Sequence, residues 1–456
     1  MRRALSTAFG LALVAPAAPL HADDNAAGRP HWPQFRGPQA RGVCESCKTP
    51  ATWNIETGEN IAWKSPLPGL GLSSPIVWGD RVFVTTAVKP EDAASKLKVG
   101  LYGDIQPINE PIEHSYRVIC LDRNTGRVLW DKEAARGVPK IKRHPKASHA
   151  NSTPVTDGRH VVAMFGAEGL YCFDMSGELK WKKDFGPIDS GFFMVKSAQW
   201  GFGSSPVIHD GRLLLQCDVQ EGSFLAAYDI NDGRELWKTP RADVPTWSSP
   251  TVLVGKDRTQ VICNGWKHIG GYDLGDGSEI WKMTGGGDIP VPTPILAGGL
   301  IFITSAHGSM APIYAIRPGA TGDITPKGQD EKGEHIAWWK ERRGNYMQTP
   351  LCYGDLLYFC MDNGMLSVYG LEKGEQIYRE RIGEGNTGFT ASIVAADDKL
   401  YVSAEVGEVF VVKTGVEYDL LGKNTFGESI MATPAISENM ILFRTEKQLV
   451  AVRGKS

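Results

Sequence analysis

The segments SSPVIHDGRLLL at 204–215 and FLAAYDINDGRELW at 224–237 decide the fold of this chain. In each segment, two short apolar runs flank a turn that contains glycine, at Gly211 and at Gly233. Glycine and its aspartate neighbours tolerate the backbone angles of tight hairpin loops, so each segment predicts a pair of antiparallel strands. Two hairpins in succession predict one four-stranded antiparallel sheet.

The same two hairpins recur along the chain. The first occurs eight times, usually starting with Ser or Thr before Pro; its other copies are SSPIVWGDRVFV at 73–84, STPVTDGRHVVA at 152–163, SSPTVLVG at 248–255, PTPILAGGLIFI at 292–303, QTPLCYGDLLYF at 348–359, TASIVAADDKLY at 390–401 and ATPAISENMILF at 432–443. Other copies of the second hairpin are RVICLDRNTGRVLW at 117–130, GLYCFDMSGELKW at 169–181 and IGGYDLGDGSEIW at 269–281. The wider spacing between Pro75 and Pro154 indicates an inserted loop from Val88 to His114. Four strands in each repeat of about 45 residues are typical of a propeller blade.

The two ends of the repeat region predict how the ring of blades closes. The last copy ends with its third strand, Gln448 to Val452, and lacks a fourth. The segment NIAWKSP at 60–66 is a strand without a hairpin partner. Pairing the two would leave no open sheet edge. We therefore predict an all-β, eight-bladed β-propeller of four-stranded antiparallel blades over residues 60–453, closed by pairing of an N-terminal strand with the C-terminal blade. Large rings on the fourth strands are expected to fill the wedges between blades: Trp63, Trp130, Trp181, Trp237, Trp281 and Trp338, with Tyr378 in their place in blade six.

Composition and the first residues predict an exported globular protein. The chain has 456 residues, is 42% hydrophobic and has a formal net charge of −3 without a long basic run, which argues against a nucleic-acid partner. Residues 1–22 have the pattern of a signal peptide, with Arg2 and Arg3 before an apolar run and cleavage after Ala22. Residues 23–59 are then an N-terminal extension. We expect a periplasmic or secreted monomer without a transmembrane segment; the Sec and Tat export routes both stay open.

The repeats resemble those of the pyrroloquinoline quinone (PQQ)-like repeat β-propellers, a superfamily that includes quinoprotein alcohol dehydrogenases and the assembly factor BamB. The Asp–turn–Gly–Trp hairpins carry this resemblance. The segments WPQFRGP at 32–38, ASHANSTP at 147–154, QWGFGSSP at 199–206 and RTEKQLVAV at 444–452 resemble a secreted bacterial branch of these proteins. The resemblance covers residues 32–453 and is specific for the fold, because one propeller can serve many functions.

For a true quinoprotein, the resemblance implies PQQ with a Ca²⁺ ion held by Glu, Asn and Asp oxygens, an Asp base, and a disulfide between adjacent cysteines. Neither adjacent cysteines nor a CxxCH haem motif occurs in this sequence. We therefore expect no cofactor, and a non-catalytic binding or scaffold protein whose partner is a protein, a peptide or a glycan. The alternative is a PQQ-dependent quinoprotein alcohol dehydrogenase-like oxidoreductase that uses PQQ and Ca²⁺.

Cysteines and histidines give few further candidates. Cys44 and Cys47 form a CESC motif before the repeats, which in an exported protein suggests a disulfide; a redox pair or half of a metal site are the alternatives. The other six cysteines lie on predicted strands and are expected to be buried thiols. No metal site is predicted, since HxH and HExxH motifs are missing from the sequence. His144 and His149 lie in a basic loop that is either simply solvated or forms an anion-attracting lip.

Loops that precede the first strand and loops that join the second and third strands should gather on one face around the axis. Together they predict a funnel of hydroxyls, aromatic rings and a few charges. The alternative role of the aromatic candidates is packing within their own loops. The alternative role of the Ser and Thr residues before Pro is to stabilise turns. The candidate binding-face residues are Asn151, Ser152, Trp200, Gln220, Glu221, Trp247, Trp266, His268, His307, Asn363, Phe389, Glu405 and Arg444.

Overall fold

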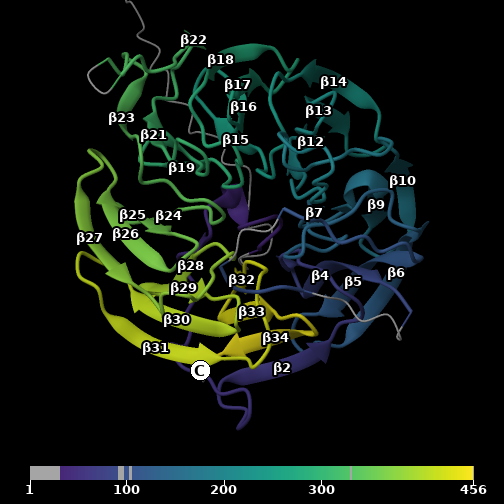
Figure 1. The fold of residues 1–456 in the computed structure, drawn as a ribbon. Coiled ribbons are helices and arrows are strands. Elements are labelled where there is room, and N and C mark those ends of the chain that lie inside the picture. Colours follow the sequence, from purple (N-terminus) through teal and green to yellow (C-terminus); the bar gives the residue numbers. More distant parts are fainter. Residues whose placement is uncertain (1–30, 91–96, 102–104, 329–330, 455–456) are drawn as a thin grey trace, which may run out of the picture.

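The computed structural model describes residues 31–90, 97–101, 105–328 and 331–454. Over these residues the chain forms eight β-sheets around a central axis, and the predicted eight-bladed β-propeller is confirmed (Figure 1). The helical structure of the described chain is limited to two 3-10 turns, η1 (Pro38–Ala40) and η2 (Gly166–Glu168). No helix in these ranges is long and apolar enough to cross a membrane. The predicted signal peptide, 1–22, lies outside the described residues.

Each blade is a four-stranded antiparallel sheet, and blades are numbered here in chain order. Blade 1 consists of β3 (Ile76–Trp78), β4 (Arg81–Val88), β5 (His114–Asp122) and β6 (Val128–Gly137), and blade 2 of β7 (Val155–Thr156), β8 (His160–Met164), β9 (Leu170–Asp174) and β10 (Leu179–Lys183). Blade 3 consists of β11 (Val207–His209), β12 (Arg212–Cys217), β13 (Phe224–Asp229) and β14 (Glu235–Pro240), and blade 4 of β15 (Thr251–Val254), β16 (Thr259–Cys263), β17 (Ile269–Asp273) and β18 (Glu279–Met283). Blade 5 consists of β19 (Ile295–Ala297), β20 (Leu300–Thr304), β21 (Ile313–Ile316) and β23 (Ile336–Lys340), and blade 6 of β24 (Leu351–Tyr353), β25 (Leu356–Cys360), β26 (Met365–Gly370) and β27 (Gln376–Arg381). Blade 7 consists of β28 (Val394–Ala396), β29 (Lys399–Ser403), β30 (Glu408–Lys413) and β31 (Leu420–Thr425), and blade 8 of β32 (Ala435–Ser437), β33 (Met440–Arg444), β34 (Gln448–Arg453) and β2 (Ile61–Pro66).

Burial along the strands follows their place in the blade. The second and third strands are almost continuously buried, as in β12, because neighbouring blades cover both faces of the sheet. The fourth strand has only one covered face. In β10, for example, Trp181 is buried while Leu179, Lys180 and Lys182 are exposed.

The ring closes as the sequence predicted. Strand β2 pairs antiparallel with β34, with Trp63 opposite Ala451 and Lys64 opposite Val450. The N-terminal strand thus supplies the fourth strand of blade 8 beside the C-terminus, as Figure 1 shows. No sheet edge is left unpaired at this joint.

Part of the N-terminal extension also belongs to the propeller. Residues 32–44 cross the axis at the end where the inner strands finish: Trp32 forms a bridge with Val77, and β1 (Val43–Cys44) pairs parallel with β28. A second extra strand, β22 (Gly322–Asp323), pairs parallel with β18 of blade 4. Both additions lie outside the repeat, so the repeat pattern does not predict them.

Five of the six predicted tryptophans link neighbouring blades. Their indole N–H groups donate to carbonyls in the turn that joins the third and fourth strands of the next blade: Trp63 to Arg123, Trp130 to Met175, Trp181 to Ile230, Trp237 to Leu274 and Trp338 to Leu371, at 2.8 to 3.1 Å. The ring of Tyr378 in blade 6 lies 6.4 Å from that of Tyr418 in blade 7.

Trp281 lies in the buried cluster between blades 4 and 5, as predicted, but its hydrogen bond differs from those of the other five. Its indole N–H donates to Oε1 of Gln260 in its own blade, and its ring covers Gly271. Blade 5 has no short turn to receive this ring, because the connection from β21 to β23 is long and contains β22. The hydrogen bond of Trp281 therefore stays within its own blade.

Candidate functional site

A funnel with a volume of about 650 Å³ opens on the axis, on the face where the inner strands begin. All eight blades contribute residues to it. Leu101 and Ile105, from the insertion between β4 and β5, also line it. The funnel predicted from the loop positions is therefore present, with additional walls from the insertion.

The base of the funnel is a hydrogen-bonded ring of Ser and Thr side chains. Each of these Ser or Thr residues directly precedes the proline position of its repeat. At six of the joints its backbone N–H donates to the hydroxyl of the equivalent residue in the next blade. These bonds, of 2.8 to 3.0 Å, join Ser74 to Thr153, Thr153 to Ser205, Ser205 to Ser249, Thr293 to Thr349, Thr349 to Ser392 and Ser392 to Thr433. These hydroxyls therefore stabilise the joints between inner strands. At the joint between blades 4 and 5 the Thr293 hydroxyl has no hydrogen-bond partner.

The N-terminal extension closes the far end of the funnel. Phe35 lines the cavity from this end. The next residue, Arg36, is fully buried, and its guanidinium donates to the carbonyls of Ile393 and Pro350 at 2.8 Å each. Burial lowers the pKa of Arg36 to about 9. The funnel is consequently a blind cavity and not a channel.

Aromatic rings form one side of the funnel wall. The Trp200 ring is stacked on Phe192 at a centroid distance of 5.6 Å and lies 5.7 Å from Trp247. Its indole N–H donates to the carbonyl of Ile105 at 3.2 Å, which ties the insertion to the wall. Further along the wall, His307 stacks on Tyr346 at 5.8 Å.

The other side of the wall contains the charged groups. Glu405 accepts hydrogen bonds from Lys146 Nζ at 2.6 Å, from the backbone N–H of Gly100 at 2.7 Å and from the Thr390 hydroxyl at 2.5 Å. Its carboxylate joins blade 7 to the insertion of blade 1. Asp362 also lines the funnel, and burial raises the pKa of its carboxyl group while nearby Lys146 opposes the shift.

The structure places six of the thirteen candidate residues on the funnel: Asn151, Trp200, Trp247, His307, Phe389 and Glu405. It places seven outside the funnel lining: Ser152, Gln220, Glu221, Trp266, His268, Asn363 and Arg444. Most of these have other contacts. Arg444 donates to Ser73, His268 contacts Glu279, and the Trp266 ring packs against Phe193 at 4.8 Å.

Several further lining residues were not predicted, among them Phe35, Leu101, Ile105 and Tyr346. Phe35 belongs to the extension, and Leu101 and Ile105 to the insertion. These segments have no counterpart in the repeat, so register could not place them. Their apolar character in otherwise polar loops was the available signal.

The basic loop around His144 and His149 is neither a solvated loop nor a free anion-attracting lip. Arg143 is almost fully buried and donates to Glu110 at 2.7 Å, and Lys146 pairs with Glu405. Ligand atoms of Glu110, His114 and His149 come within 4.8 Å of one another. Lys89 and Arg143 already neutralise Glu110, and they would repel a metal cation at this position.

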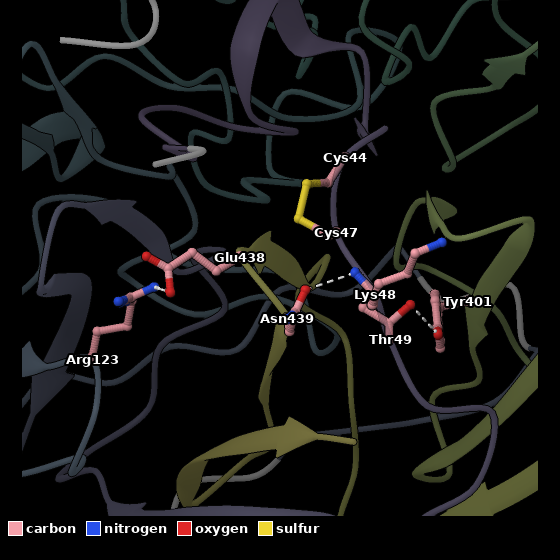
Figure 2. Close-up of a disulfide and its surroundings, with 8 residues drawn as sticks. All are labelled: Cys44, Cys47, Lys48, Thr49, Arg123, Tyr401, Glu438 and Asn439. Carbon is pink, nitrogen blue, oxygen red and sulfur yellow. Dashed lines mark hydrogen bonds and ion pairs between the residues drawn. A yellow bond between two sulfur atoms is a disulfide. The ribbon is translucent and has the colours of Figure 1, made fainter. Parts of the chain in front are cut away.

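Cys44 and Cys47 form a disulfide at the far end of the axis (Figure 2). The other cysteines of the described chain are free, and all are buried except Cys352, which is half-buried and not fully buried as predicted. Next to the disulfide, Lys48 donates its backbone N–H to Asn439 at 2.8 Å. A second cavity on this face, of about 880 Å³, is lined by charges of both signs, among which Lys48 pairs with Asp397 and Arg123 with Glu438.

The funnel does not fit the PQQ and Ca²⁺ that the resemblance implies. Its charged lining residues are Lys146, Asp362 and Glu405, so carboxylates outnumber cations where a quinone carrying carboxylate groups would bind. Calcium requires several oxygen ligands, but the Glu405 carboxylate is already held by three donors and the Asn151 amide oxygen accepts from Ser148. Cysteine is absent from the funnel lining of the described chain.

Comparison with known proteins gives one family match and several similar structures. The sequence profile described as outer membrane protein assembly factor BamB matches residues 114–380. No curated protein sequence matches this chain.

The similar structures include both of the functional classes considered above. BamB from Moraxella catarrhalis has 13% identity and a TM-score of 0.52, with 82% of this chain and 98% of that chain covered. The quinohemoprotein alcohol dehydrogenase from Comamonas testosteroni has 12% identity and a TM-score of 0.62, with coverage of 95% and 82%. A europium-containing methanol dehydrogenase has 12% identity and a TM-score of 0.61, with coverage of 92% and 89%. At these identities the likeness concerns the fold alone.

Proposed function

Because the chain belongs to the family of PQQ-like repeat propellers described as outer membrane protein assembly factor BamB, we propose that it is an exported, non-catalytic protein that binds a partner on its loop face. The observation that carries the proposal is the blind, largely apolar and aromatic funnel, which lacks a donor set for PQQ and Ca²⁺. The pattern of residues 1–22 supports export.

Of the partners considered, a protein or peptide is favoured over a glycan. Two exposed apolar side chains line the funnel, Leu101 at 40% and Ile105 at 39% exposure. Met194, two residues after the Phe192 ring that stacks on Trp200, is 70% exposed. Exposed apolar groups beside a concave aromatic site are typical of polypeptide recognition.

Site-specific photo-crosslinking tests this proposal. A benzophenone amino acid replaces Met194, which follows the Phe192 ring that stacks on Trp200 of the funnel wall. The control position is Val416, which is 64% exposed and lies in the turn between β30 and β31. We expect a covalent adduct with an exported protein of the source organism from position 194 only. Equal adducts from both positions, or none from position 194, would contradict a partner site at the funnel.

The alternative quinoprotein dehydrogenase is tested with added PQQ and Ca²⁺. Purified protein is mixed with both, and reduction of an artificial electron-acceptor dye is followed with short alcohols. We expect no alcohol-dependent dye reduction, because the funnel charge and committed oxygens oppose quinone and calcium binding. Saturable turnover would refute the non-catalytic assignment.

A further inference from the structure

One carboxylate lines the funnel without an ion pair. Asp362 lies in the connection from β25 to β26, and its side chain forms no salt bridge with any described residue. The other acid, Glu405, is 1% exposed and is neutralised by Lys146 at 2.6 Å. Lys146 is therefore shared between two carboxylates, and among the Lys, Arg, Asp and Glu residues that line the funnel the negative charges outnumber the positive by one.

Aromatic rings lie in the same cavity as this carboxylate. Tyr346 and Asp362 both line the funnel, and their proximity is reflected in the pKa of the Tyr346 phenol, which burial and then the Asp362 charge raise to about 12. Trp200 and Trp247 continue the aromatic wall. The negative faces of aromatic rings attract cations, most strongly where water is excluded.

The rest of the wall suits an apolar stem below a charged head. The apolar side chains of Ile289, Val291 and Met347 also line the funnel. A lysine or arginine side chain combines an apolar stem with a cationic end. A neutral apolar side chain would fill the same volume but would leave Asp362 desolvated without a partner, which is costly.

We propose that the funnel takes up a lysine or arginine side chain presented by a partner polypeptide. This inference rests on the proposed function and specifies its ligand. Asp362 is the counter-ion, the aromatic wall of Trp200, Trp247 and Tyr346 shares the cavity with it, and exposed Leu101 and Ile105 contact the flanking residues of the partner. A small free amine would satisfy the charge but would not use the exposed mouth.

Matched peptides test the charge requirement on the intact protein. The probes are acetyl-Gly-Leu-Lys-Leu-Gly-amide and the same peptide with norleucine or glutamate in place of lysine. Dissociation constants are measured by ligand-observed NMR and isothermal titration calorimetry. We expect the lysine peptide to bind about tenfold more tightly than the norleucine peptide, and the glutamate peptide to bind most weakly.

Two variants locate the effect. Asp362→Asn is expected to reduce the lysine preference to about twofold or less, because the counter-ion is removed. Glu221→Gln is the control: Glu221 is 86% exposed, lies in the equivalent connection of blade 3 and is outside the funnel, so the preference should be unchanged. The wild-type peptide series remains decisive if either variant folds poorly.

The outcomes separate the two proposals. Equal affinity for the lysine and norleucine peptides, or a full preference in Asp362→Asn, overturns the inference. If an adduct still forms from position 194, the proposed function survives this failure. Binding of n-butylammonium as tight as that of the lysine peptide overturns the assignment to a polypeptide.

Discussion

Glu110 is the most heavily paired carboxylate outside the funnel. It lies 2.8 Å from Lys89 Nζ, 2.7 Å from Arg143 Nε and 3.3 Å from His149 Nε2, and its side chain is only 10% exposed. Burial alone would raise the pKa of Glu110, but hydrogen bonds from His149, Arg143 and Lys89 hold it well below the ordinary value. This group fixes the insertion against the loop that carries Lys146.

Replacing Glu110 should therefore be costly. Glu110→Gln leaves two buried cations without a carboxylate, and we expect a loss of about 3–5 kcal/mol in the free energy of unfolding, measured by denaturant titration. Glu221→Gln serves as the exposed control and should change it little. A loss below about 1 kcal/mol for Glu110→Gln would show that the cluster is not a stabilising unit.

The same group predicts a pH dependence. Because the pKa of Glu110 is lower in the folded state than the unfolded value of 4.5, its contribution is complete above that value and is lost as the pH falls. The stability difference between the wild type and Glu110→Gln should therefore shrink below about pH 4.5. A difference that stayed constant on acidification would contradict this assignment.

Blade-to-blade contacts explain why the elements were predictable from the sequence. At five joints the fourth strand of a blade carries a tryptophan whose ring covers the turn glycine of the next blade, as Trp181 covers Gly233. The repeat therefore encodes both a blade and its joint. Trp281 does not donate across its joint, because this hydrogen bond needs a matching turn in the following blade, and blade 5 has an insertion there.

Two glycines with similar backbone angles test this joint. Gly233 has a φ of 73°, and a Cβ there would lie 2.7 Å from the Trp181 ring; Gly211 has a φ of 68° with no atom within 4 Å of such a Cβ. We expect Gly211→Ala to lower the free energy of unfolding by only about 1 kcal/mol, the cost of placing alanine in a left-handed backbone conformation. Gly233→Ala should lower the free energy of unfolding by about 1–3 kcal/mol more, because its Cβ displaces the Trp181 ring. Equal losses in denaturant titrations would refute the joint.

At the scale of the whole molecule, repeat register predicted the ring and the position of the funnel. It also placed Trp200, Trp247 and Glu405, because they occupy loops at fixed positions in the repeat. It could not place Phe35 or Ile105, since the extension and the insertion have no repeat, and their contacts depend on the closed ring. Arg444 was also a candidate but lies outside the funnel, because it donates to Ser73 at the joint between blades 8 and 1.

Closure by β2 predicts the effect of truncation. A chain beginning at residue 67 lacks β2, so β34 becomes an exposed edge that can pair with another chain. We expect a lower thermal midpoint and self-association in size-exclusion chromatography with light scattering. A chain beginning at residue 60 also lacks β1 and the buried extension but retains β2, and it is the control. A monomeric chain from residue 67 with an unchanged midpoint would contradict this role of β2.

The pairing of β2 with β34 also has a consequence for the order of events during biosynthesis. Residues 61–66 leave the ribosome before any blade is complete, whereas their partner, residues 448–453, is among the last segments to be made. Contacts between such distant segments form slowly, and domains made by a ribosome start folding from the N-terminus. The nascent protein must therefore keep β2 unpaired until translation is nearly finished, and during that interval both β2 and the growing blades have an edge that can aggregate.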